Sequence, residues 1–150
     1  MTEVTDLLPA WADAAAATDR LAARPAADGV LLTLAPMQST FLALRAGPWE
    51  QLTASLDAGF GERPPARRGA VLGSLAHLHA FTLGARAAVD RQGALVIVSD
   101  RIADRLDAPE RLRWLFSLQV VANACLSVVA ATGDVPLLHD GAQALLGRPG

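Results

Sequence analysis

Two histidines separated by one residue are the first side chains in this sequence with the potential to hold a metal ion. His77 and His79 lie in the run LAHLHAF. Histidines two residues apart share a face on a strand, but on a helix they diverge by about 200°. The surrounding leucines recur at helical spacing, and no cluster of Asp, Glu or Cys stands nearby. The sequence therefore predicts neither a metal site nor a bound cofactor here.

The single cysteine is the second candidate for chemistry, because a thiolate is a strong nucleophile. Cys125 lies in the middle of an apolar segment, where burial disfavours the thiolate. We expect it to be a packed structural residue rather than a catalytic one. One cysteine cannot form an internal disulfide, which fits a reducing cytoplasm.

Charged residues gather between 100 and 107 without forming a recognisable catalytic or calcium site. Asp100, Asp104 and Asp107 alternate with Arg101 and Arg105. This alternation indicates a charge-balanced loop rather than a set of calcium ligands. No combination of residue types elsewhere in the chain forms a catalytic set, so we expect a protein without enzymatic activity.

Length and composition predict a single soluble domain. The chain has 150 residues, of which 52% are hydrophobic and 5% aromatic, so its core must consist of Leu, Val and Ala. We assign 1–150 to one domain, with 134–150 as a short C-terminal extension. The net charge of −2 gives no reason to expect nucleic-acid binding. The acidic N-terminus lacks the basic start of a signal peptide, which indicates a cytoplasmic protein, and the Arg-only basic residues are typical of a GC-rich bacterial genome.

The hydrophobic spacing of the first half predicts a helix followed by strands. Apolar residues recur at helical spacing over 5–23, after which RPAADG breaks the helix. The apolar runs at 30–35 and 39–46 predict two strands. Residues 49–60 fit the period of a helix and that of a strand. We favour a third strand there, because a β-meander joins these segments by short loops.

The next segment predicts a second helix and a hairpin. An apolar stripe over 71–79 indicates the helix. Alternating residues at 81–89 and a return run at 94–100 flank the turn Asp90–Gly93. An acidic residue and a glycine within four turn positions, between apolar runs, are typical of a β-hairpin.

A long uncharged run predicts the last helix. Residues 114–133 carry no charge, and Asp107 and Glu110 have the spacing of a helix-capping pair, so we expect a helix over 109–131. The run is long enough to span a membrane. Polar side chains interrupt it, however, so we expect a soluble core helix with no membrane contact. The order α-β-β-β-α-β-β-α then predicts an α+β fold with helices packed on a twisted antiparallel sheet.

Two apolar stripes run along this last helix, and the sheet can bury only one of them. The first stripe comprises Leu112, Leu115, Phe116, Ala122, Leu126 and Val129. The second comprises Trp114, Leu118, Val121, Cys125 and Val128. An uncovered stripe of this size is typical of an interaction site. We therefore expect the second stripe, with Trp11, to form a dimer or partner surface; the alternative is that the N-terminal helix covers it.

A Leu-rich segment, a hairpin and the start of a helix follow one another in LGSLAHLHAFTLGARAAVDRQGALVIVSDRI and DAPERLRWLF. With this order the chain resembles, over about residues 29–132, the YbjN-like proteins, which share the fold of type III secretion chaperones. In such proteins a Leu-rich helix leads into a hairpin with an Asp-x-x-Gly turn, and a helix opening with Pro-Glu closes the domain. The resemblance implies a homodimer that binds segments of partner proteins.

Together, the residues and the resemblance predict a non-enzymatic, dimeric protein-binding module of chaperone or adaptor type. A small-molecule-binding sensor domain is the alternative, which requires a cavity with converging polar groups. Gln119 and Asn123 lie one turn apart on the last helix and are the candidates for such groups.

Overall fold

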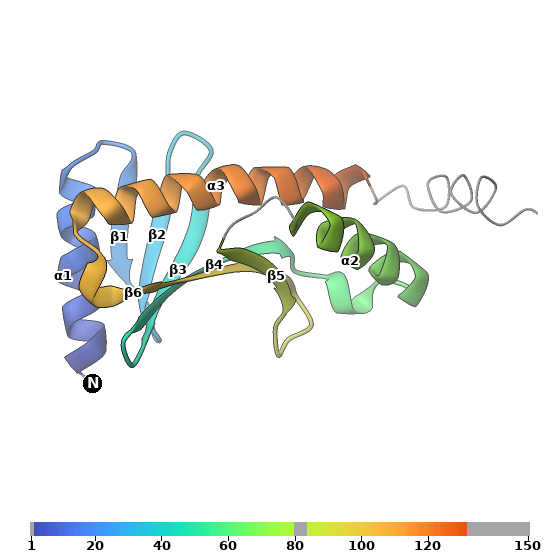
Figure 1. Cartoon of the computed structure of the whole chain (residues 1–150), viewed down its shortest axis with the longest axis horizontal. Coiled ribbons are helices and arrows are strands. Elements are labelled where there is room, and N and C mark those ends of the chain that lie inside the picture. Colours follow the sequence, from blue (N-terminus) through green and yellow to red (C-terminus); the bar gives the residue numbers. More distant parts are fainter. Residues whose placement is uncertain (1, 80–83, 132–150) are drawn as a thin grey trace, which may run out of the picture.

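Apolar residues at every second position build a six-stranded antiparallel sheet, and helices pack against one of its faces (Figure 1). The computed structural model describes residues 2–79 and 84–131. Its helices are α1 (Thr2–Ala16), α2 (Pro65–His79) and α3 (Ala108–Ala131). Its strands are β1 (Leu21–Pro25), β2 (Val30–Leu34), β3 (Ser39–Ala46), β4 (Trp49–Asp57), β5 (Ala85–Val89) and β6 (Leu95–Ile102), with 3₁₀ turns η1 (Phe60–Glu62) and η2 (Ala103–Arg105).

The strands follow the order β1-β2-β3-β4-β6-β5, and every neighbouring pair is antiparallel. The first four form a meander, and the β5–β6 hairpin adds to β4 through β6. This architecture confirms the predicted α+β class. Residues 49–60 contribute β4, which pairs with β3 on one side and β6 on the other, so the strand interpretation of this segment is correct. The predicted hairpin is present as β5 and β6, whereas its first positions, 81–83, and the extension at 134–150 lie outside the described residues.

The N-terminal helix is shorter than the sequence predicts, and an additional strand follows it. The helix ends at Ala16 instead of continuing to residue 23, and β1 pairs with β2 from Leu21 opposite Leu34 to Pro25 opposite Val30. Thr18 accepts a hydrogen bond from the Arg20 N–H through its Oγ1, which favours a turn at this point. Leu21 continues the helical spacing only by coincidence, because its burial comes from the pairing with β2.

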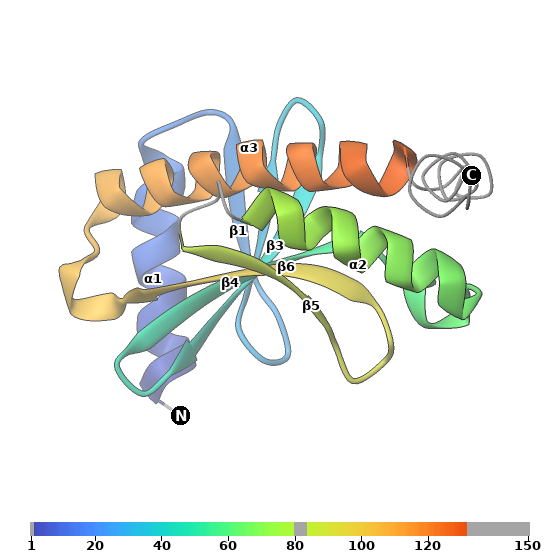
Figure 2. The ribbon, with the colours of Figure 1, turned by 45° about the vertical axis from the view of Figure 1, so that its right-hand side comes forward.

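One face of the sheet forms the core together with the helices. The inward positions of the central strands are almost completely buried: Val30, Leu32, Leu34, Phe41, Ala43, Leu52, Leu95 and Ile97. Buried residues of α1, α2 and α3 join the same cluster. In Figure 2, α2 runs beside the second half of α3, with which it is in contact. The described helices therefore direct their buried side chains to one face of the sheet.

The last helix is fixed to the sheet at its N-terminal end. The Asp107 Oδ1 accepts a hydrogen bond of 2.8 Å from the Glu110 N–H, as expected for a helix cap. Arg111 forms a buried ion pair with Glu50 of β4 and also donates to the Leu106 carbonyl at 3.0 Å. The helix is long and apolar enough to span a membrane, with a mean hydropathy of 1.7. Its inner side nevertheless packs in the core.

Candidate partner-binding surface and an arginine-lined pocket

The residues predicted to form a dimer or partner surface lie mainly inside the chain. Trp11, Leu118 and Cys125 are fully buried or nearly so, and Trp114 is 5% exposed. The indole rings of Trp11 and Trp114 pack with their centroids 6.3 Å apart. The N-terminal helix thus covers this part of the second stripe. These four side chains are core residues of the single chain and offer almost no exposed surface, which corrects the expectation of an uncovered stripe.

The two apolar stripes lie along the two margins of one broad buried face of α3 and are not on opposite sides of the helix. Arg111, Leu115, Leu118, Ala122 and Cys125 are buried at alternating spacings of four and three residues, which defines a single side of a helix. Val121 and Val128 of the predicted surface lie at the margin of this side and are half-buried. A helix covered by a sheet and by two other helices buries more than one narrow stripe.

Gln119 and Asn123, the amides considered for a small-molecule sensor, are not found at a cavity large enough for such a ligand among those in the described residues. Gln119 donates a hydrogen bond of 2.8 Å from Nε2 to the Asn123 Oδ1, and its own Oε1 is buried without a hydrogen-bond partner among the described residues. Gln119 lines a space of only about 30 Å³. Such a space holds a single water molecule at most.

The histidine and cysteine candidates show no catalytic arrangement. His77 is exposed on α2. In residues 2–79 and 84–131, no group of three His, Cys, Asp or Glu side chains is placed to hold a metal ion. Cys125 is buried, and desolvation raises the pKa of its thiol. A raised pKa lowers the population of the reactive thiolate. Cys125 packs in the hydrophobic core, as its apolar neighbours in the sequence predict.

The described helices leave the outward face of the sheet uncovered. Leu31 and Leu42 are paired neighbours on it, and Leu44 lies on the same face two residues further along β3. These three side chains are half-buried, whereas their inward neighbours are covered by helices. Trp49, which begins β4 on this face, is 47% exposed. A continuous row of partly exposed apolar side chains is typical of an interaction surface.

One edge of the sheet adjoins this face. β1 is one of the two terminal strands of the described sheet and pairs only with β2. It is short, and its outward positions, Ala22 and Arg24, are exposed. An edge strand presents unpaired backbone donors and acceptors to an added strand.

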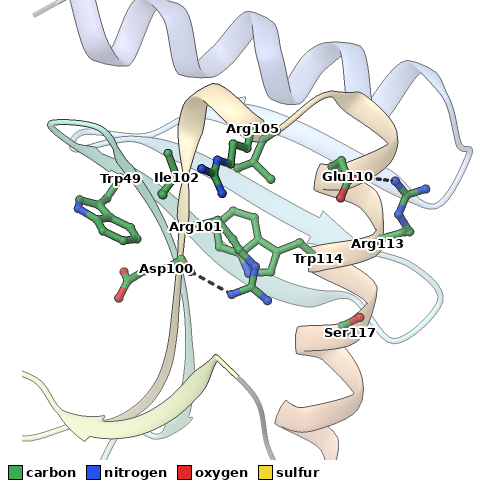
Figure 3. A pocket seen from close by; sticks show the side chains of 10 residues that line it. Trp49, Asp100, Arg101, Ile102, Arg105, Glu110, Arg113, Trp114 and Ser117 are labelled. Carbon is green, nitrogen blue, oxygen red and sulfur yellow. Dashed lines mark hydrogen bonds and ion pairs between the residues drawn. The ribbon is translucent and has the colours of Figure 1, made fainter.

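A pocket of about 480 Å³ opens between the end of β6, η2 and the first turns of α3 (Figure 3). Its walls contain three arginines, two tryptophans, two carboxylates and two aliphatic side chains: Arg101, Arg105, Arg113, Trp49, Trp114, Asp100, Glu110, Ile102 and Leu106, with Ser117 at one side. The sequence offered only the alternating charges at 100–107 as a signal. The structure corrects the idea that these charges balance within the loop, because Asp100 pairs with Arg86 of β5 and Asp107 caps α3.

Comparisons with known proteins were made by sequence and by structure. No family model matches the chain, and no curated protein sequence matches it. The structure is similar to that of YbjN from E. coli, which is provisionally assigned as a transcription regulator, with a TM-score of 0.60 and 14% identity over 85% of this chain and 92% of that one. It is also similar to a chain of the HopA1–SchA chaperone–effector complex, with a TM-score of 0.52 and 12% identity over 82% of this chain and 92% of that one. A chain of the ExoU–SpcU complex from the type III secretion system of Pseudomonas aeruginosa gives a TM-score of 0.47 and 15% identity, over 75% of this chain and 84% of that one.

The structure therefore has a YbjN-like fold of the type III secretion chaperone class. This confirms the fold that the sequence resemblance implies. At these identities the likeness concerns the fold alone, so function must be argued from the surfaces of this chain.

Proposed function

We propose that this protein is a non-enzymatic, cytoplasmic bacterial module of chaperone or adaptor type that binds a segment of a partner protein. The observation that carries the proposal is the uncovered outward face of the sheet, with Leu31, Leu42 and Leu44 half-buried and Trp49 47% exposed. The similarity in fold to a chain of a chaperone–effector complex supports the same role.

The surface suits an extended segment. Backbone groups along the free side of β1 can pair with an added strand, which provides affinity with little dependence on sequence. Leu31 lies next to β1 across the sheet, opposite Arg24. A strand added at β1 lies about 14 Å from β3, at about 4.8 Å per strand, so the part of the segment that follows the paired strand must cross the outward face to place its apolar side chains on the leucine row. Selectivity then depends on how well those side chains fit between the leucines.

We further propose that the protein forms a homodimer through the outer side of α3. Val120 is 69% exposed in the middle of that helix. Ala124 and Val128 follow it at four-residue spacing, and Val121 lies three residues before Ala124; all three are half-buried. Two copies of this apolar strip packed together would remove it from water, whereas a monomer leaves it partly hydrated.

Site-directed photo-crosslinking in cells tests the binding face. A photoreactive residue in place of Leu42 should crosslink to a defined protein partner, because that position is central in the outward leucine row. The matched control carries the same group in place of Asp13, which is exposed on α1. Crosslinking of one partner from both positions, or from neither, would contradict the proposed face.

A further inference from the structure

The pocket at the end of β6 has a charge pattern that its own side chains leave unbalanced. Asp100 accepts a hydrogen bond of 3.0 Å from Gln51 Nε2 on one carboxylate oxygen and one of 2.8 Å from Arg86 Nη1 on the other. Glu110 accepts a hydrogen bond of 2.6 Å from Arg113. Both carboxylates of the pocket lining are therefore paired, and Arg113 is the partner of Glu110 in one of these pairs.

Two arginines remain without a carboxylate partner among the described residues. Arg101 is held in place, because its guanidinium lies 5.7 Å from the ring centroid of Trp114 and its Nη1 donates to the Asp100 backbone carbonyl at 3.0 Å. Arg105 is exposed on η2, and the described residues offer it neither an ion pair nor a hydrogen bond. Figure 3 shows both side chains at the pocket, between Trp49 and α3.

The pocket also has an apolar wall beside these cations. Trp49, Ile102 and Leu106 line it together with the arginines. Its volume of about 480 Å³ lies within the range of small-ligand sites. Guanidinium groups bind carboxylate and phosphate oxygens in a planar, often bidentate geometry. A ligand that suits all these features carries an oxyanion next to a flat or aliphatic group.

We propose that this pocket binds the carboxylate or phosphate of a small amphipathic group, with Arg101 and Arg105 on the oxyanion and Trp49 against the apolar part. The proposal does not depend on partner capture at the leucine row. The same chemistry can come from a free small anion or from an acidic side chain on a bound segment. Arg101 is preorganised by its stacking, so it loses little conformational freedom on binding.

The test is to titrate the full chain with small probes and to monitor the NMR signals of the Trp49 and Trp114 indole N–H groups. The probes are inorganic phosphate, 3-phenylpropionate, its uncharged amide, and a capped peptide that alternates leucine and glutamate. We expect phenylpropionate or the peptide to shift these indole signals saturably, and the amide to leave them unchanged. Phosphate alone should bind more weakly, since it does not use the apolar wall.

Arg105→Gln and Arg91→Gln form a matched pair of variants. Both residues are exposed, and Arg91 lies in the β5–β6 turn outside the pocket lining. Removing one charge-assisted contact at Arg105 should weaken binding by about tenfold, whereas Arg91→Gln should bind as the wild type does. Binding of phenylpropionate identifies a free anion as the source, and binding of the peptide alone identifies an acidic side chain. The proposal is overturned if no probe shifts the indole signals, or if Arg105→Gln binds as tightly as Arg91→Gln.

Discussion

Arg111 of α3 and Glu50 of β4 form an ion pair in the interior of the protein, with both side chains almost inaccessible to solvent. Two nitrogens of the guanidinium donate to the two oxygens of the carboxylate, and a third nitrogen donates to the Leu106 carbonyl. The pair joins the start of the last helix to a central strand. The sequence gives little sign of it, because the two residues lie 61 positions apart.

Removing one partner of this pair should be strongly destabilising. Arg111→Met leaves the Glu50 carboxylate buried without its counter-ion, which costs about 3–5 kcal/mol. The combined variant Arg111→Met with Glu50→Leu should recover much of this loss, because it removes both charges. Urea unfolding of the three proteins measures the difference. Equal stability of Arg111→Met and the wild type would show that the pair does not form.

Truncation of the two tryptophans Trp11 and Trp49 should lower stability to different extents. Trp11→Ala removes a fully buried side chain that packs against Trp114, so it should lower the free energy of unfolding by about 3–5 kcal/mol. Trp49→Ala alters a side chain that is 47% exposed and should cost less than about 1 kcal/mol. Thermal unfolding distinguishes the two, and a mild effect of Trp11→Ala would return that residue to the list of surface candidates.

The Cys125 thiol should make the protein less stable at alkaline pH. Burial raises its pKa in the folded state above the ordinary value of 9.0. The folded chain therefore holds this proton more tightly than the unfolded chain does. Below the ordinary pKa the group has no effect on the pH dependence, and as the pH rises above it the free energy of unfolding falls. Chemical denaturation between pH 7 and pH 10 should show a smaller alkaline loss in Cys125→Ala than in the wild type; identical slopes would argue against a raised pKa.

The dimer proposal predicts a specific effect at Val120. Val120→Glu places a charge on the exposed side of α3, so it should shift the mass measured by light scattering from dimer to monomer while the melting temperature stays close to that of the wild type. Ala12→Glu adds the same charge on an exposed position of α1 and should leave the dimer intact. A monomeric wild-type protein at high concentration contradicts the proposed interface.

Local sequence patterns predict most helices and strands of the fold, but not the tertiary contacts between them. The period-two runs and the capping pair at Asp107 and Glu110 predict the strands and the start of α3, since these signals depend on near neighbours. The sequence does not predict the strand β1, because only Leu21 of its five residues is buried and its extended conformation depends on pairing with β2, a tertiary contact that a single window does not reveal.

The candidate site was harder to predict than the fold. Hydrophobic spacing showed that Trp114, Leu118 and Cys125 belong to an apolar side of α3, but not that the sheet, α1 and α2 together cover it. Likewise, the charges at 100–107 looked balanced in sequence. Their partners come from Gln51 and Arg86 on other strands, and this leaves Arg101 and Arg105 unpaired by carboxylates among the described residues.

Binding of the crosslinked partner to purified protein tests the proposed function most directly. The comparison uses Leu42→Glu, which places a charge in the outward leucine row, and Ala16→Glu, which places the same charge at an exposed position at the end of α1. Isothermal titration calorimetry should show at least a tenfold loss of affinity for Leu42→Glu, equivalent to about 1.4 kcal/mol, and wild-type affinity for Ala16→Glu. Both variants should keep the wild-type melting temperature within a few degrees. Wild-type affinity in a folded Leu42→Glu protein would contradict partner capture on this face.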